Sequence, residues 1–242
     1  MLRIIDARTG EPVPAAPVRR GLTRVEAHAS GSGTGALRVL LVADVLARAL
    51  ELDGTPVMTA LSGGPERAEL RTAAAALGIR PFEEARDVAY GTGGARSLHV
   101  VAEDGEAPPE ALRISVAPVL AAAPVPPDTD PTALRLALLS HHHRRPVPLD
   151  ADALREAQGA LARWRRAVAD WSRSPSRPVP DDIGERLRTA WEDDLDVPRV
   201  LGVLRAVEEA GPELPDGARF ETYAYIDRLL GLELTRDLGA LA

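Results

Sequence analysis

The sequence contains no cysteine and no lysine among its 242 residues. All 29 of its basic side chains apart from histidine are therefore arginine. The lack of cysteine excludes disulfides and any zinc site with thiolate ligands. The lack of lysine excludes a Walker A loop, a Schiff-base lysine and any lysine that contacts a phosphate.

Aromatic residues make up only 3% of the chain, although 45% of it is hydrophobic, so the core must consist of alanine, leucine and valine. No apolar run approaches the roughly 18 residues of a membrane span. The N-terminal stretch MLRIIDARTGEPVP lacks an apolar run of signal-peptide length. We therefore expect a cytoplasmic protein with no membrane partner. The length predicts one large domain or two small ones.

The net charge of −7 argues against a generic nucleic-acid binder, which is usually basic. The charge is unevenly distributed, however. Between Arg135 and Arg177 the chain has nine arginines and four acids, a local balance of +5. A contact with an RNA backbone in this region therefore remains one of the alternatives.

Alternating and helical patterns follow one another in the first half. Strands are expected in RIIDARTGEPVP (3–14), GLTRVEAHAS (21–30), TPVMTALS (55–62) and SLHVVAED (97–104), and helices in ALRVLLVADVLARALELDG (36–54) and SGGPERAELRTAAAALGIR (62–80). The order strand, helix, strand, helix, strand predicts a parallel sheet of the doubly wound kind.

Five prolines in ISVAPVLAAAPVPPDTDP, at positions 118, 124, 126, 127 and 131, disfavour a helix or a central strand there. We therefore expect a connector over about 115–131, between a domain at 1–130 and a second at 131–242. The second domain is expected to be a bundle of about five helices, in the segments 131–145, 149–172, 181–196, 197–211 and 220–234.

Several segments resemble cysteinyl-tRNA synthetases. TALRLALLSHHHRRPVPLDADALREAQGALARWRRAV (132–168) resembles the family's (A/T)-L-R-x-x-L-L-S-x-H-Y-R segment and the long helix after it, and WEDDLDVPRVLGVL (191–204) resembles the next helix pair. RIIDARTGEPVP resembles the opening strand, and 36–54 the helix after the HIGH motif. The mycothiol cysteine ligases share these features, and ALARWRRAV resembles them especially.

The resemblance covers about 1–60 and 130–242, and it implies an α/β fold: a shortened class I synthetase-type Rossmann domain followed by an α-helical bundle. It also implies that the middle segment with most zinc ligands is absent, since only about a hundred residues separate GALR (35–38) from TALR (132–135).

The departures from the family pattern concern its chemistry. If GALR matches the family's G-N-A-R, Gly33 stands where the first histidine of HIGH is expected, and Arg24 where a zinc-ligand cysteine is expected. A KMSKS loop requires lysine, and no arginine equivalent is present. The resemblance therefore leaves no catalytic residue and no metal ligand to assign. Removing one oxyanion-type donor costs roughly 10²–10³ in rate, so efficient adenylate formation is not expected.

The stretch HASGSGTGALR (28–38) lies between a strand and a helix and meets the loose pattern G-x-G-x-x-A. Backbone N–H groups at a helix N-terminus attract phosphate. The nucleotide-binding candidates are Ser30, Gly31, Ser32, Gly33, Thr34, Gly35 and Arg38. Because the pattern alone is weak, a surface loop left after erosion of the motif is the alternative.

Histidines and arginines supply the remaining candidates. HHHRR (141–145) is expected at a solvated helix end rather than in a metal site, because consecutive side chains on a helix point about 100° apart. His28 and His99 are expected to be isolated, each a histidine of a strand or of the core edge rather than a catalytic base. Arg144, Arg145, Arg163 and Arg166 are candidates for a tRNA or partner contact, with a solvated helix face as the alternative.

Three functions follow from these observations. The leading one is a degenerate paralogue of the synthetase and ligase family that acts as a non-catalytic binding or regulatory protein, with a protein partner. The second is a divergent ATP-dependent cysteine ligase that uses the GSGTG amides and Arg38 or Arg24. The third is a tRNA-binding accessory protein. No cofactor is assigned with certainty, and ATP or another small nucleotide is the candidate.

Overall fold

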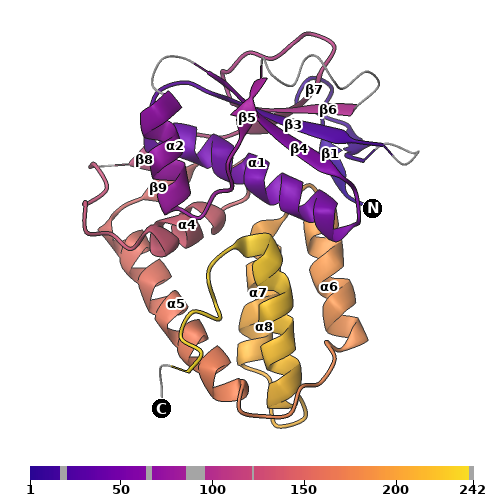
Figure 1. The fold of residues 1–242 in the computed structure, drawn as a ribbon, viewed down its shortest axis with the longest axis vertical. Helices are drawn as coiled ribbons and strands as arrows, with labels where there is room; N and C mark the ends of the chain where they lie inside the picture. Colours follow the sequence, from indigo (N-terminus) through magenta and orange to yellow (C-terminus); the bar gives the residue numbers. More distant parts are fainter. Residues whose placement is uncertain (17–20, 64–66, 86–95, 122, 240–242) are drawn as a thin grey trace.

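The computed structural model describes residues 1–16, 21–63, 67–85, 96–121 and 123–239. Figure 1 shows a sheet above one layer of helices and a helical bundle below that layer. The expected α/β fold, a shortened Rossmann-like domain followed by helices, is confirmed.

The central sheet has five parallel strands in the order β5-β4-β3-β6-β7. These strands are β3 (Thr23–Ala29), β4 (Val57–Gly63), β5 (Glu83–Glu84), β6 (Arg96–Ala102) and β7 (Leu112–Val116). A hairpin of β1 (Arg3–Ile5) and β2 (Pro12–Pro14) precedes it, and β8 (Val119–Ala121) pairs in parallel with β9 (Val147–Leu149). The strands expected in 3–14, 21–30, 55–62 and 97–104 are therefore present.

Helix α1 (Thr34–Leu52) packs under the middle of the sheet, and α2 (Arg67–Ala76) lies beside it on the same side (Figure 1). Leucine, valine and alanine side chains of α1 occupy nearly every face of the helix, which is typical of a helix buried on all sides. The chain leaves α1 through Gly54, whose φ of +77° lies in the left-handed region that favours glycine. Pro65, expected near the start of the second helix, lies outside the described residues.

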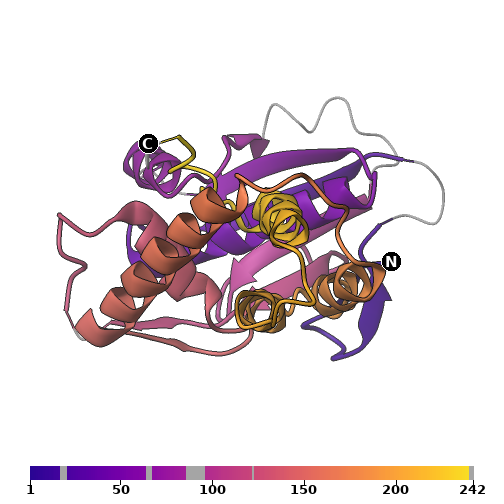
Figure 2. The same cartoon turned by 90° about the horizontal axis from the view of Figure 1, so that it is seen from below.

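The other helices in the described part of the chain are α4 (Pro131–Leu139), α5 (Ala151–Trp171), α6 (Asp181–Glu192), α7 (Val197–Glu208) and α8 (Asp216–Leu230). Seen from below in Figure 2, α6, α7 and α8 stand nearly end-on under the sheet, and α5 runs obliquely past them. Asp130 begins α4 by accepting a hydrogen bond from the Thr132 N–H at 2.8 Å. The five expected helices are confirmed.

One hydrophobic core runs through both halves of the chain. It includes Val25 on β3, Leu41 on α1, Trp164 on α5 and Leu229 on α8, all nearly inaccessible to solvent. Alanine, leucine and valine dominate it, as the composition requires. The boundary near residue 130 stays a prediction, and the core is continuous across it.

Two expectations about local structure are wrong. The expected connector, about 115–131, contains the end of β7 and the whole of β8. The proline at 118 lies beyond the end of β7, which is an edge strand, and therefore interrupts no hydrogen-bond ladder. Helix α4 also ends at Leu139, before the three histidines. In the described part of the chain, no helix combines the length and the apolar character needed to cross a membrane.

Candidate functional site

A cavity of about 540 Å³ opens where the carboxyl ends of β3, β4 and β6 meet the N-terminus of α1. The chain runs from β3 outward to β4 and later returns to the other side of β3 as β6, so the strand order reverses at this point. Open α/β sheets bind ligands in such crevices. The described residues that line this strand-end cavity are His28, Ala29, Ser30, Gly35, Ala36, Val39, Ser62, Gly63, Ala102, Asp104, Gly105 and Glu106.

The first turn of α1 has no side-chain cap. Gly33 is the N-cap residue, and neither a cap hydrogen bond nor an acid in the first turn occupies the helix end. A Cβ atom placed on Gly33 or Gly35 would meet nothing within 4 Å. Packing therefore does not require glycine at either position, and the N–H groups of this turn are open to an anion. Gly31, by contrast, has a φ of +79° that favours glycine.

The structure brings together only part of the predicted nucleotide site. Ser30 and Gly35 line the strand-end cavity, while Gly31, Ser32, Gly33 and Thr34 form the loop and first turn beside them.

Arg38 is not part of this cavity. Its Nη1 donates to the carbonyl of Ala117 at 2.5 Å, its Nη2 donates to the carbonyl of His142 at 2.9 Å, and only 1% of the residue is exposed. Burial lowers the pKa of Arg38 to about 10. The prediction that Arg38 contacts a nucleotide is therefore wrong, because its guanidinium is used inside the fold.

His28 and His99 are not isolated, contrary to expectation. His28 Nε2 lies 2.8 Å from His99 Nδ1 on the neighbouring strand. The carboxylate of Glu26 accepts a hydrogen bond from the Ser62 hydroxyl and lies 3.8 Å from His28 Nε2. The alternation of Arg24, Glu26 and His28 in β3 was the available signal, since residues two apart share a face of a strand.

The polar groups at the strand-end cavity carry little positive charge. Burial is the main cause that lowers the pKa of His28 and of His99 below the ordinary value of 6.5, and Glu26 opposes it only in part. Burial therefore favours the neutral form of both imidazoles. Among the described residues that line the cavity, Asp104 and Glu106 are the charged ones, so this part of the lining is negative.

Arg24 lies on the same strand face but is paired. Its Nη2 is 2.7 Å from Glu26 Oε2 and donates to the Ala85 carbonyl at 3.2 Å. It is not among the described residues that line the strand-end cavity.

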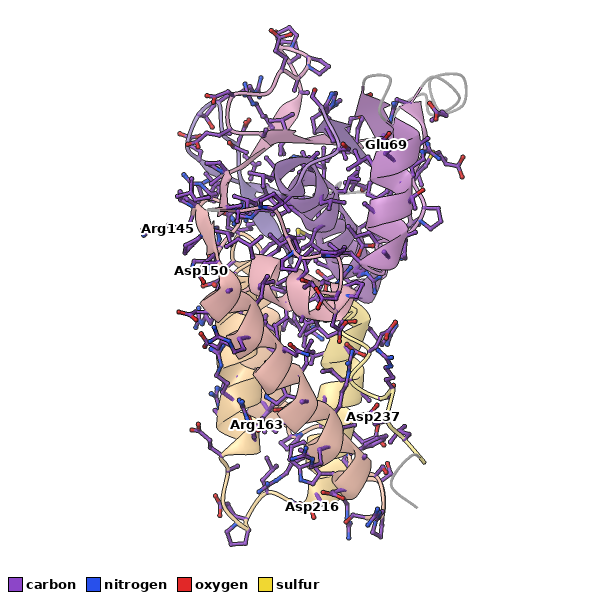
Figure 3. All side chains as sticks on the ribbon, turned by 90° about the vertical axis from the view of Figure 1, so that its left-hand side faces the viewer. Glu69, Arg145, Asp150, Arg163, Asp216 and Asp237 are labelled. Carbon is purple, nitrogen blue, oxygen red and sulfur yellow. The ribbon has the colours of Figure 1, made fainter. Side chains whose placement is uncertain are left out.

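The arginine candidates for a partner contact do not form one patch. Arg144 and Arg145 follow α4, whereas Arg163 and Arg166 lie well along α5; Figure 3 shows Arg145 near the start of α5 and Arg163 far from it. Arg163 is 3.6 Å from Glu208, and its side chain is mostly exposed. Arg165, within the same basic run, is buried and donates to the carbonyls of Leu232 and Glu233.

The histidine run was also placed wrongly. Since α4 ends before it, the three side chains do not follow helical spacing. His143 is 5% exposed rather than solvated, and both it and His142 face the carboxylate of Asp194.

This architecture is a shortened Rossmann-type α/β layer joined to a helical bundle, with a cavity at the position where such sheets bind ligands. No family model matches the chain. Its curated relatives include ligases named L-cysteine:1D-myo-inositol 2-amino-2-deoxy-alpha-D-glucopyranoside ligase, the mycothiol cysteine ligases.

The relative from Streptosporangium roseum is 40% identical over 110 residues, which is 44% of this chain and 26% of that protein. The one from Cellulomonas flavigena is 37% identical over 120 residues, 48% of this chain and 28% of that protein. The one from a Mycobacterium species is 36% identical over 110 residues, with 43% and 25% covered.

The chain thus spans about a quarter of the length of the curated relatives it matches. The expected resemblance is confirmed at this level. The chain is a partial relative of the mycothiol cysteine ligases, a family related to cysteinyl-tRNA synthetase.

Proposed function

We propose that this chain is a non-catalytic binding protein derived from the cysteine ligases, and that it forms no aminoacyl adenylate. The observation that carries this proposal is the charge of the strand-end cavity. Among the described residues that line it, two are carboxylates and none is an arginine. Adenylate formation places negative charge on the transferring phosphate and needs fixed cations or donors there.

The same charge selects the ligand. The open N–H groups of the first turn of α1 attract one phosphate-like group without help from a side chain. Asp104 and Glu106 repel the additional charge of a triphosphate. A ligand with a single anionic group, such as a nucleoside monophosphate or an acyl adenylate, therefore suits this cavity better than ATP.

A divergent ligase would need the guanidinium groups of Arg38 or Arg24 at its active site, but both groups are held by other contacts in the fold. Arg38 donates to the carbonyls of Ala117 and His142, and Arg24 is held by Glu26. Using either arginine for catalysis would break contacts in the interior. This disfavours a divergent ligase that relies on Arg38 or Arg24.

Two measurements on the purified chain test the proposal together. The first is thermal denaturation with AMP, with ATP and magnesium, and with a non-hydrolysable cysteinyl-adenylate analogue. A ligand present at about 100 times its Kd stabilises the fold by about 2.7 kcal/mol, a rise in Tm of roughly 5–10 °C. We expect that rise with AMP or the analogue and a smaller one with ATP.

The second measurement is cysteine-dependent ATP–pyrophosphate exchange. We expect none above the level of a Gly33→Asp variant prepared in parallel, which controls for traces of host synthetase. Exchange that the Gly33→Asp substitution abolishes would overturn the proposal in favour of the ligase. No thermal shift with any of the three compounds would instead mean that the strand-end cavity is not a nucleotide site.

A further inference from the structure

A second polar cluster lies where two connecting segments meet beside the hairpin of β1 and β2. In the sequence, these segments come long after the glycine loop. One segment follows α4 and carries His142 and His143, and the other joins α6 to α7 and carries Asp194. The Ile5 N–H donates to Asp194 Oδ1 at 2.8 Å, and the Asp194 N–H donates to the Arg3 carbonyl at 2.9 Å. These two bonds fix the position of the carboxylate.

The cluster has the spacing of a ligand set. His142 Nε2 lies 3.7 Å from Asp194 Oδ2, and His143 Nε2 lies 3.8 Å from Asp194 Oδ1. All three ligand atoms lie within 4.8 Å of one another. A tetrahedral ion with bonds of about 2.0–2.1 Å holds neighbouring ligand atoms about 3.3–3.4 Å apart. A small closing movement of two connecting segments would therefore complete the geometry.

The hydrogen bonding of the cluster is incomplete. His143 is 5% exposed, and neither of its ring nitrogens has a hydrogen-bond partner among the residues that the structure describes. Asp194 is 6% exposed, and its Oδ2 also lacks a hydrogen-bond partner. Buried polar groups without partners are rare in folded proteins and destabilise them. One cation bound between His143 Nε2 and the Asp194 carboxylate would give a partner to one of the two ring nitrogens and to the carboxylate.

We propose that His142, His143 and Asp194 bind one divalent transition-metal ion. Two imidazole nitrogens and one carboxylate oxygen form a donor set that suits zinc. A solvent-open cavity of about 980 Å³, lined in part by His142 and Asp194, adjoins the cluster. Water or a ligand thus reaches the fourth position of the ion from this side.

Binding changes the state of one ring. His142 Nδ1 accepts a hydrogen bond from the Arg144 N–H at 3.2 Å, so Nε2 carries the proton and donates to the Asp194 carbonyl at 3.0 Å. With an ion on Nε2, the proton moves to Nδ1 and both contacts are exchanged for the metal bond. Arg144 also lies 3.8 Å from Asp194 Oδ2, while Asp193 and Asp196 supply compensating negative charge around the cavity.

The other candidate cluster, Glu26, His28 and His99, fits an ion less well. Its two imidazole nitrogens are 2.8 Å apart and hydrogen-bonded to each other, closer than two ligands of one ion. Glu26 is already paired with Arg24 and Ser62. This cluster therefore supplies a matched control, because it also contains two histidines and a carboxylate but joins them by hydrogen bonds and an ion pair.

The test uses the full chain without a histidine tag. Zinc per chain is measured after dialysis against a buffered zinc concentration, and the visible absorption of bound Co²⁺ reports the ligand geometry. We expect one ion per chain and a zinc-dependent rise in Tm. His142→Ala removes a partly exposed ligand and is expected to weaken zinc binding at least about tenfold. Asp194→Asn should do the same with little change in shape.

Two controls make the outcome decisive. His141→Ala removes the histidine that precedes the proposed ligands, and His28→Ala removes one histidine from the cluster of Glu26, His28 and His99. Both variants should retain the zinc affinity of the wild type. Tm in the presence of a chelator checks that each variant is folded. Absence of zinc binding in the wild type, or binding that His28→Ala removes and His142→Ala leaves intact, would overturn the proposal. Neither result bears on nucleotide binding in the strand-end cavity.

Discussion

The carboxylate of Asp44 and the guanidinium of Arg135 meet 2.9 Å apart in the interior, with 1% and none of their surface exposed. Asp44 belongs to α1 under the sheet, and Arg135 to α4. Arg135 also donates to the carbonyl of Leu230 at the end of α8 and to that of Leu77 after α2. One buried ion pair thus joins the sheet layer to the helical bundle.

Asp44→Asn should destabilise the fold strongly. Asp44 also binds Arg48 at 2.9 Å and Arg80 at 3.1 Å, so its loss leaves buried positive charge without a counterion. Removing one partner of a buried pair costs about 3–5 kcal/mol in free energy of unfolding. Urea denaturation measures this loss. The matched control is Glu51→Gln, which breaks a largely exposed contact with Arg80 and should cost less than about 1 kcal/mol. Equal effects of the two variants would contradict the assigned role of Asp44.

Gly33→Asp and Gly33→Asn should separate helix capping from ligand binding. Both side chains cap a helix better than glycine, so each should raise the free energy of unfolding by a few tenths of a kcal/mol. The Asp carboxylate repels an anion at the same N–H groups, whereas the Asn amide carries no charge. We therefore expect Gly33→Asp alone to abolish the AMP-dependent rise in Tm. The idea fails if the neutral Asn variant loses the response as completely as the Asp variant.

The stability of the fold should decrease as the pH falls below about 6.5. Burial lowers the pKa of His28 and of His99 in the folded chain, while in the unfolded chain these groups titrate near 6.5. Between the unfolded and folded pKa values the unfolded chain binds more protons, so acid favours unfolding. The charged groups beside the pair are Arg24 and Glu26.

Urea denaturation at several pH values between about 7.5 and 5.5 measures this dependence. We expect His99→Gln, which removes one titrating ring, to reduce the loss of stability over that range. A slope equal to that of the wild type would show that the imidazole pair does not contribute.

We expect no detectable binding of bulk tRNA at about 0.15 M salt. The chain carries a net charge of −7, Arg165 of the basic run is buried, and Arg145 lies far from Arg163 (Figure 3). Filter binding over a series of salt concentrations tests this. Affinity that falls steeply with salt and depends on Arg144 and Arg145 would support the tRNA-binding accessory protein instead.

Local patterns were sufficient for most elements of the fold. The apolar residues of α1 and the alternation in β3 are readable without the structure, because each period is set by backbone geometry. β7 was missed because the prolines that disfavour a strand begin at position 118, beyond its last residue, Val116. The histidine run was assigned to a helix because no glycine marks the end of α4 at Ser140.

By itself, the sequence determined the fold class, the strands β3, β4 and β6 with the helices α1 and α2, the five later helices, the make-up of the core and the chemistry that a chain without lysine or cysteine lacks. Only the tertiary structure decided which arginines are buried and which polar groups meet. Arg38 and Arg135 bind backbone carbonyls tens of residues away, and Asp194 meets histidines fifty residues before it. Such partners leave no periodic signal, since any residue supplies a carbonyl and the packing of distant segments brings these groups together.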